Sequence, residues 1–477
     1  MAGPSAQPDR RFDCYYASAA GEDQCATCCT RSRLGERLLG SSLLHMTCLP
    51  HRWTQGHEVM LGRATMAAAL LLGLAACGTT SEKLRLANKD CRDRNPDQAA
   101  ALAACNLLLE RNPPAEDRAR FLAARGTAYT KSDRYVEGIA DLSAALALTP
   151  DNTAARLTRA QAEEKVGDMA AARADYDQVL QEAPWTFNAR TGRARIALAS
   201  GDEEVAVADL TEALTIRPER GGTLTMRAAA YRQANNPKAA VGDLSEAIRL
   251  QPENAELYLA RANALMAMGD DAAALADAQT AAGLAPKSVS AYAVSGYLRL
   301  RQGDLDGAVA DYDKVIALAP DDAAGYRNRA YVQYKRGAFD LAIADYTRAL
   351  GLEPQLAAAY AGRGDAIAKK GDDVAAMADF DAALRLEPDN ALFLNSRANA
   401  EIRLGKLDAA IADFDKAIAL SPDLAALFYG RGKAYLVLEK PREARADFNE
   451  ALHLDPALEA ARYQLESVAK LEKRLRG

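Results

Sequence analysis

The chain has 477 residues, of which 49% are hydrophobic, only 6% aromatic and 26% charged, and its formal net charge is −6. Alanine supplies much of the hydrophobic content, which suits closely packed helices better than the core of a β-sheet. Acidic and basic residues are interspersed, so the sequence lacks the one-sided basic stripe of a nucleic-acid-binding protein. Four histidines and two tryptophans leave little material for a catalytic or metal centre.

Residues 1–59 show no periodicity that predicts a helix or a strand. They contain a group of cysteines and histidines that suggests a zinc site: Cys25, Cys28, Cys29, His45, His51 and His57. Their spacing matches no standard zinc finger, and a second ligand pair at the usual spacing is missing. The alternative interpretation is that this stretch is disordered, or is a non-native extension in front of the true start.

Residues 60–76 have the layout of a secretory signal peptide. Arg63 gives a positive start, Thr65 to Leu74 is a short apolar run, and small residues follow. The apolar run is too short to span a bilayer as a helix. Because a signal peptide belongs at an N-terminus, we expect Met60 or Met66 to be the start of the natural product.

The end of this segment, Leu74-Ala75-Ala76-Cys77, resembles a bacterial lipobox, which is cleaved before a lipid-modified cysteine. The resemblance implies that Cys77 is the mature N-terminus and carries acyl chains, with residues 77–81 as a lipid-anchored linker. Gly78 stands where an aspartate retains lipoproteins in the inner membrane of enteric-type bacteria. The expected location is therefore the outer membrane, facing the periplasm. The alternative is a plain signal peptide with a chance cysteine.

A proline recurs every 34 residues through most of the remaining chain: Pro150, Pro184, Pro218, Pro252, Pro286, Pro320, Pro354, Pro388, Pro422 and Pro456. A constant period of this length is typical of stacked repeats, in which each unit meets its neighbour in the same way. If each unit is numbered so that its proline is position 32, ten units fill residues 119–458.

Each unit has the pattern of two amphipathic helices, with apolar residues spaced three and four apart. Small residues at positions 8, 20 and 27 allow the two helices to approach closely. Glycine at position 15 predicts a left-handed residue that ends the first helix. It occurs in seven units, and asparagine replaces it once: Gly167, Gly201, Gly269, Gly303, Gly337, Gly371, Gly405 and Asn235.

Together, the unit length, small positions, glycine cap and proline resemble the tetratricopeptide repeat (TPR) family, and the lipobox adds a resemblance to bacterial TPR lipoproteins. The resemblance covers about 80% of the chain. It implies an all-α, right-handed superhelical solenoid of antiparallel helix pairs. The family's large residue at position 4 is often missing, and its position-11 tyrosine survives mainly at Tyr129, Tyr231 and Tyr435. These departures weaken single units without disturbing the period.

Two atypical elements flank the array. Residues 82–118 are expected to form a degenerate first repeat, whose two helices carry Cys91 and Cys105 toward each other. In an oxidising compartment these cysteines can form a disulfide, and the alternative is a pair of buried thiols. Residues 459–477 are expected to form a capping helix that solvates the C-terminal end, as in the family.

Charged residues also follow the period. Arginine stands at position 7 in nine of ten units, with Ser295 as the exception, and aspartate stands at position 23 in all ten. This pattern predicts a ladder of structural charge pairs, either within a unit or between units. Aspartates two residues apart, such as Asp413 and Asp415, point away from each other on a helix. The sequence therefore predicts no catalytic residue, no metal site and no cofactor.

In this family, ligands lie against first-helix positions 2, 5, 9, 12 and 13. Carried over residue by residue, these positions predict a partner-binding groove: Asn263, Tyr297, Arg301, Arg327, Tyr331, Tyr334, Lys335, Lys369, Asn395, Asn399, Arg403, Tyr429 and Lys433. Four cations share position 13 in consecutive units: Arg301, Lys335, Lys369 and Arg403. With tyrosines and asparagines beside them they suit an extended or acidic peptide. The family's carboxylate clamp for chaperone tails is not reproduced, and the alternative is a merely solvated inner face.

The sequence therefore predicts an exported lipoprotein that is not an enzyme. It is expected to be a protein–protein interaction scaffold, presenting its groove to cell-envelope partners in assembly, secretion or cell-wall machinery, with no nucleic acid bound. Two alternatives stay open: a soluble cytosolic co-chaperone or adaptor, and a non-catalytic or catalytic subunit of an envelope enzyme complex.

Overall fold

The computed structural model describes residues 82–91 and 97–476. The expected signal peptide, Cys77, the linker and the cysteine and histidine cluster of residues 1–59 lie outside the described residues. Regular structure in the described part is α-helical throughout, which confirms the expected all-α class. None of these helices combines the length and the apolar character needed to cross a bilayer.

A helix over 82–91 and α2 (Gln98–Leu109) precede the ten units. The first five units hold α3 (Ala115–Lys131) with α4 (Tyr135–Leu148), α5 (Thr153–Val166) with α6 (Met169–Glu182), α7 (Phe187–Ser200) with α8 (Glu203–Ile216), α9 (Gly221–Gln233) with α10 (Pro237–Leu250), and α11 (Ala255–Ala267) with α12 (Asp271–Leu284). The next five hold α13 (Val289–Gln302) with α14 (Leu305–Leu318), α15 (Ala323–Lys335) with α16 (Phe339–Leu352), α17 (Ala357–Lys369) with α18 (Asp373–Leu386), α19 (Ala391–Arg403) with α20 (Leu407–Leu420), and α21 (Ala425–Val437) with α22 (Pro441–Leu454). The last helix is α23 (Glu459–Arg476).

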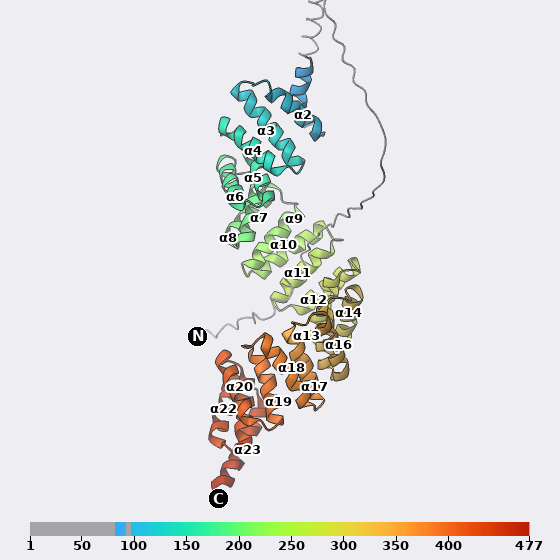
Figure 1. Ribbon diagram of the computed structural model, residues 1–477, viewed down its shortest axis with the longest axis vertical. Helices are drawn as coiled ribbons and strands as arrows, with labels where there is room; N and C mark the ends of the chain where they lie inside the picture. The colour runs from blue at the N-terminus through green and yellow to red at the C-terminus, as the bar shows by residue number, and fades with distance from the viewer. Residues whose placement is uncertain (1–81, 92–96, 477) are drawn as a thin grey trace, which may run out of the picture. The chain divides into compact units, whose positions relative to one another are not determined.

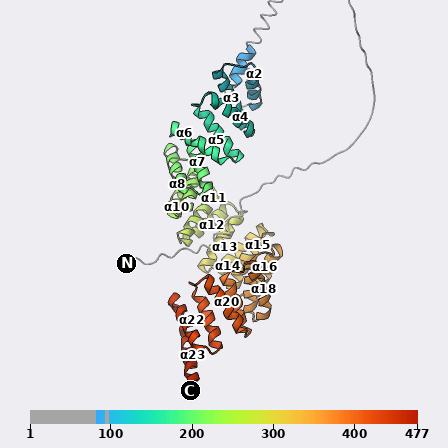
Figure 2. The same cartoon turned by 60° about the vertical axis from the view of Figure 1, so that its left-hand side comes forward.

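Successive helices of this array pack against each other in chain order (Figure 1). Figure 2 shows the same succession after a turn of 60°. Beyond sequence neighbours, contacts join first helices of consecutive units, for example α15 with α17 and α17 with α19. This is the arrangement expected of a repeat array, in which each unit touches only adjacent units.

The residue at position 15 ends each first helix as predicted. The seven glycines there have φ angles between 72° and 94°, and Asn235 has a φ of 53°. Asp133 and Glu439, at the same position in the first and last units, also have φ angles of 56°, although their residue types did not predict it. The tertiary structure therefore imposes the left-handed turn even where glycine is absent.

Small residues in the first helices make room for large rings from the second helices. Phe380 and Phe414, at position 24, are fully buried. A Cβ atom at Gly364 would lie 2.8 Å from Cε1 of Phe380 in the same unit. A Cβ atom at Gly362 would collide with the ring of Tyr346, which belongs to the preceding unit. These glycines let each ring pack under its own first helix or under the next one.

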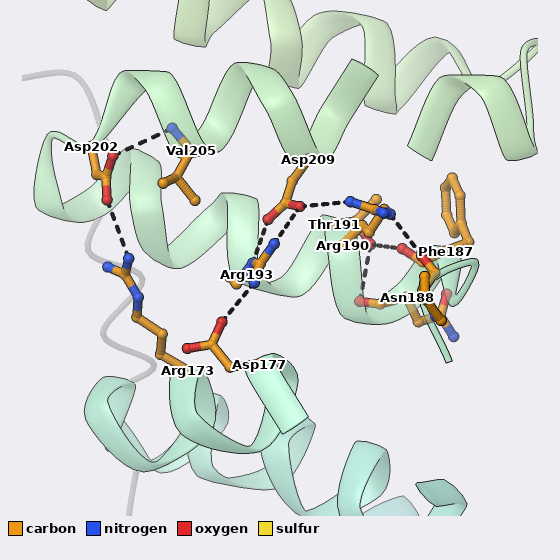
Figure 3. A network of polar contacts seen from close by, with 11 residues as sticks. Arg173, Asp177, Phe187, Asn188, Arg190, Thr191, Arg193, Asp202, Val205 and Asp209 are labelled. Carbon is orange, nitrogen blue, oxygen red and sulfur yellow. Dashed lines mark hydrogen bonds and ion pairs between the residues drawn. The ribbon is translucent and has the colours of Figure 1, made fainter. Parts of the chain in front are cut away.

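The arginine at position 7 forms a rung that joins three helices. Arg193 donates from Nε and Nη2 to the two carboxylate oxygens of Asp209 at 2.6 and 2.7 Å, and from Nη1 to Asp177 of the preceding unit at 2.6 Å (Figure 3). Hydrogen bonds to Asp209 raise the pKa of the Arg193 guanidinium, so it stays charged. The sequence left open whether the charge pairs form within a unit or between units. This arginine does both, because it pairs with the aspartate of its own unit and also bonds to the preceding unit.

The other eight arginines repeat this geometry. Each donates two hydrogen bonds to the aspartate 16 residues later: Asp141, Asp175, Asp243, Asp277, Asp345, Asp379, Asp413 and Asp447. Their Nη1 atoms reach acceptors on the preceding second helix: Asn106, Ser143, Thr211, Ser245, Asp313, Thr347, Asp381 and Asp415. In an adjacent pair such as Asp413 and Asp415, one carboxylate therefore serves its own unit and the other serves the next.

One rung is different. Ser295 donates to Asp311 at 2.6 Å, and Nε of Arg299 lies 3.4 Å from the same carboxylate, so the charge of Asp311 is still balanced. Burial raises the pKa of Asp311, and these two neighbours oppose that shift. The serine is too short to reach Gln279, which occupies the acceptor position of the preceding unit and is exposed. This joint therefore lacks the cross-unit ladder bond.

Two units carry a buried glutamate at position 11, where the family has its tyrosine. Burial raises the pKa of Glu163 and of Glu401 to about 7, with the nearby aspartate of the rung adding to the shift. One carboxylate oxygen of each glutamate has no hydrogen-bond partner. Position 11 therefore lies in a low-dielectric layer beside the ladder.

The two ends of the array are closed differently. A disulfide joins Cys91 to Cys105 of α2, with an S–S distance of 2.16 Å, and both cysteines pack near Phe121 of the first full unit. At the other end, Ala461 and Val468 of α23 pack against the core of the last unit.

We predict that Arg397→Ala lowers the free energy of unfolding by about 2 kcal/mol, because it leaves the carboxylates of Asp413 and Asp381 without their shared partner. Urea denaturation followed by circular dichroism measures the loss, and hydrogen exchange should place it in α19 and α20. The control is Arg385→Ala, which removes an exposed arginine from the neighbouring α18. Equal losses in the two variants would contradict the role of the rung.

Candidate partner-binding groove

The predicted groove residues lie on one face of the first helices, from α11 to α21. On a helix that turns about 100° per residue, positions 5, 9 and 12 share a face, and positions 4, 7 and 11 lie on the other side. Seven of the groove residues are half-buried: Tyr297, Arg327, Tyr334, Asn395, Asn399, Tyr429 and Lys433. The other six are exposed: Asn263, Arg301, Tyr331, Lys335, Lys369 and Arg403. Contacts between α15 and α17, α17 and α19, and α19 and α21 bring these residues onto adjoining surfaces.

Cations stack on tyrosines along this face. Nζ of Lys335 lies 5.3 Å from the ring centre of Tyr331, and Nζ of Lys433 lies 5.6 Å from that of Tyr429. Arg301 lies over Tyr297 in the same way, at 5.9 Å. All three pairs are four residues apart on one helix, which is the spacing that brings side chains together. The stacking holds each cation beside an aromatic surface.

The four cations at position 13 divide into two kinds. Arg301 forms an ion pair with Asp271 at 3.1 Å, and Arg403 forms one with Asp373 at 2.7 Å. Both aspartates stand at position 17 of the preceding unit. The residues at that position that correspond to Lys335 and Lys369 are Leu305 and Phe339, which carry no charge.

Lys335 and Lys369 consequently make no ion pair within the described residues. They are the cations of this series that can accept a partner's carboxylate without first giving up one from the array. The sequence predicted four equivalent cations, and the structure distinguishes two that are paired from two that are not.

Asp365 is a groove residue that the sequence analysis did not select. It stands at position 9 of α17, and that register was the signal that could have identified it. Burial raises the pKa of Asp365 to about 6, while a hydrogen bond with Ser396 and the charges of Lys369 and Arg403 oppose the rise. Its carboxylate also adds to burial in raising the pKa of Tyr334.

Neighbouring side chains complete the surface. Asn399 donates from Nδ2 to the backbone oxygen of Asn395 at 2.8 Å, and Arg327 donates to Asn328 at 2.9 Å. Burial lowers the pKa of Lys433, and the nearby charge of Arg403 lowers it further. The inner face of α15 to α21 is thus a set of cations around one buried carboxylate, with tyrosines beside them. Such a surface favours carboxylate-bearing ligands.

Family comparisons match the array. A family described as TPR repeat matches residues 296–337 and 398–438, and one described as Tetratricopeptide repeat matches residues 123–185, 157–220, 225–289 and 336–391. Together these matches cover more than half of the chain.

The chain belongs to the tetratricopeptide repeat family. This confirms the resemblance to the TPR family and the all-α TPR superhelix expected from the sequence, while the resemblance to bacterial lipoproteins stays a prediction. TPR proteins bind proteins or peptides and are generally non-catalytic, and this TPR protein is accordingly a protein–protein interaction scaffold.

The chain is similar to several solved structures. A tetratricopeptide repeat protein from Parabacteroides merdae is 19% identical with a TM-score of 0.46, over 52% of this chain and 98% of that one. Yeast Tom70 is 18% identical with a TM-score of 0.41, over 83% and 97%. The APC/C hetero-tetramer Cut9-Hcn1 gives 15% identity and a TM-score of 0.45, over 81% and 95%. No curated protein matches the chain.

We predict that Asp365→Asn changes the pH dependence of stability. Because the pKa of the folded carboxyl lies above its ordinary value of 3.8, its contribution to stability is complete below about pH 4 and is lost as the pH rises through 6. Asparagine cannot ionise, so the variant should keep its melting temperature between pH 4 and 7 better than the wild type does. Asp408→Asn, at an exposed site on α20, is the control. Parallel melting curves for Asp365→Asn and wild type would disprove the buried carboxylate.

Proposed function

We propose that the protein is an exported lipoprotein whose TPR array is a scaffold for partners in the cell envelope, and that the inner face of α13 to α21 binds an extended, acidic segment of such a partner. The observation that carries the groove assignment is a pair of cations on contacting helices, Lys335 and Lys369, that form no ion pair with the described residues, although the charge of Lys369 also acts on Asp365. Acidic residues of a partner would supply the negative charges that Leu305 and Phe339, at position 17, do not provide for these two lysines.

The aromatic residues of this face support a peptide ligand. Tyr331 is 43% exposed although it lies under Lys335, so part of its ring is available for contact. Tyrosines and arginines are the residues that most often dominate binding energy at interfaces. Solvated lysines mainly increase the association rate and make it sensitive to salt. Binding is therefore expected to combine a salt-sensitive association with an aromatic contact that slows dissociation.

Export is supported by two features. The first is the sequence of residues 60–77, with its apolar run and its cysteine at the end. The second is the disulfide between Cys91 and Cys105, because structural disulfides persist in oxidising compartments outside the cytosol. Two or more acyl chains on Cys77 would hold the array stably at a membrane, whereas one chain would hold it only marginally.

We expect Lys335→Glu combined with Lys369→Glu to weaken binding of a glutamate-rich fluorescent peptide by at least tenfold, and to abolish in-cell crosslinking to the envelope partner. Fluorescence anisotropy at two salt concentrations measures the first effect. The matched control is Lys287→Glu with Lys314→Glu, which changes the net charge equally at two exposed positions outside the groove. Undiminished binding by the groove variant would remove this site from the proposal.

Labelling with radioactive palmitate tests the anchor. The wild-type protein is expected to incorporate label, and Cys77→Ala is expected to incorporate none, because the acyl-bearing cysteine is gone. The Cys91→Ala, Cys105→Ala double variant should keep the label, since those cysteines belong to the disulfide. Label that survives Cys77→Ala, or an unlabelled wild type, would refute the lipoprotein assignment.

A further inference from the structure

A pocket of about 350 Å³ opens between two consecutive units, on α18, α19 and α20. Leu384 and Leu394, which are core residues only 7% and 2% exposed, form its floor, Pro388 adds an apolar wall, and Arg385 and Lys416 stand at its charged rim. The Arg397 rung forms the rest of the wall, and its guanidinium is fully engaged by Asp413 and Asp381. Lys416 pairs with Asp389 and donates to the backbone oxygen of Pro388, so Arg385 is the rim cation available to a ligand's charge.

The pocket faces away from the groove. Leu394 stands at position 4 of α19, whereas Asn399 and Arg403 of the groove stand at positions 9 and 13. At about 100° per residue they lie about 140° and 180° around the helix from Leu394. A ligand on this surface would not compete directly with a peptide in the groove.

The pocket lies at a joint where position 4 carries no ring. Position 4 carries an aromatic residue in the four units before this one and in the one after it: Tyr258, Tyr292, Tyr326, Tyr360 and Phe428. In this unit it carries Leu394. A second pocket, of about 300 Å³, lies in the same register, where position 4 is Arg190 and the lining includes Leu180 and Gln181. Both of these pockets lie at joints where position 4 carries no ring.

Another unit of the array shows which kind of side chain packs beneath the cation that corresponds to Lys416. In the unit of α15 and α16, the guanidinium of Arg348 lies 5.6 Å from the ring centre of Tyr326. Arg348 and Lys416 occupy the same position 26, and Tyr326 and Leu394 occupy the same position 4. Lys416 even keeps the matching acidic neighbour, since its Nζ lies 3.0 Å from Asp389 and Arg348 lies 4.0 Å from Asp321. Lys416 therefore occupies the place of the Arg348 cation, but Leu394 provides no aromatic ring beneath it.

The rim also favours a negative group. Arg385 is exposed and forms no ion pair or hydrogen bond with the described residues, while Asp381 and Asp413 are held by the rung. A carboxylate next to a bound ring would find the Arg385 guanidinium without displacing an existing partner. Arginine can bind a carboxylate with two parallel hydrogen bonds.

We propose that this pocket binds an aromatic side chain of a partner polypeptide that is flanked by an acidic residue. The ring packs on Leu384 and Leu394 under Lys416, as Tyr326 packs under Arg348, and the flanking carboxylate pairs with Arg385. The site is a second docking point on the scaffold, and it is independent of the groove.

The probe is a fluorescein-labelled peptide with the core Glu-Trp-Glu, titrated with the full-length protein and followed by anisotropy. Two comparison peptides, with cores Glu-Ala-Glu and Gln-Trp-Gln, separate the ring from the charge. We expect both to bind at least fivefold more weakly than Glu-Trp-Glu. Equal binding of Glu-Ala-Glu would reduce the site to a charged surface and overturn the proposal, as would no binding of Glu-Trp-Glu to the wild type.

Leu394→Tyr fills the pocket with the residue that sibling units carry, so it is compatible with the fold, and it should weaken Glu-Trp-Glu binding at least tenfold. Leu284→Tyr, at an exposed position of α12 in a distant unit, is the control and should leave binding unchanged. Arg385→Ala provides a second test on an exposed residue, with an expected loss of about fivefold. Wild-type affinity in both Leu394→Tyr and Arg385→Ala would overturn the site.

Free indole-3-acetate distinguishes a small ligand from a polypeptide. Weak competition, at concentrations well above those of the peptide, supports a polypeptide partner. Competition as strong as that of the peptide itself would identify a free aromatic acid as the ligand and overturn the assignment to a partner side chain.

Discussion

The position-7 arginine is the interaction on which the rest of the array depends. One guanidinium bonds twice to the aspartate of its own second helix and once to the preceding second helix, so it fixes two helix contacts at once. Half-buried ion pairs of this kind specify register more than they add net stability. Because the planar fork of arginine allows only a narrow range of angles, the ladder sets the same rotation at each step where it is intact. The groove inherits its geometry from this regularity.

The two faces of the first helices have different roles, one in packing and one in binding. Positions 4, 7 and 11 face the second helices and are used for packing, and the arginine of position 7 repeats in nine of ten units. Positions 5, 9 and 13 face the opposite side and vary. Whether a position-13 cation is available depends on position 17 of the preceding unit, where Asp271 and Asp373 neutralise Arg301 and Arg403 but Leu305 and Phe339 leave Lys335 and Lys369 unpaired. Binding character therefore changes along the array while the backbone stays the same.

The departures from the period are the most informative residues. Leu394 stands where neighbouring units carry a ring, and it lines a pocket beside an existing cation. Ser295 replaces an arginine and removes one cross-unit bond, while Arg299 keeps the charge of Asp311 balanced. Asp365 places a carboxylate among groove cations at the cost of burying it. In a repeat array the common residues build the fold, and a change in one unit is tolerated locally because its effects extend only to adjacent units.

The sequence by itself determined the all-α class, the phase of the 34-residue unit, the left-handed caps and the register of the groove, because these depend on residues near each other in the chain. It also carries the predictions of export and lipidation at residues 60–77, which lie outside the described residues. The tertiary structure alone decided that each position-7 arginine bridges two units, that two of the four position-13 cations form no ion pair with the described residues, and that Asp365 is half-buried. Those facts depend on distances between side chains 16 to 34 positions apart in the sequence. Such distances are set by the packing angles of helices, and composition and periodicity do not specify those angles.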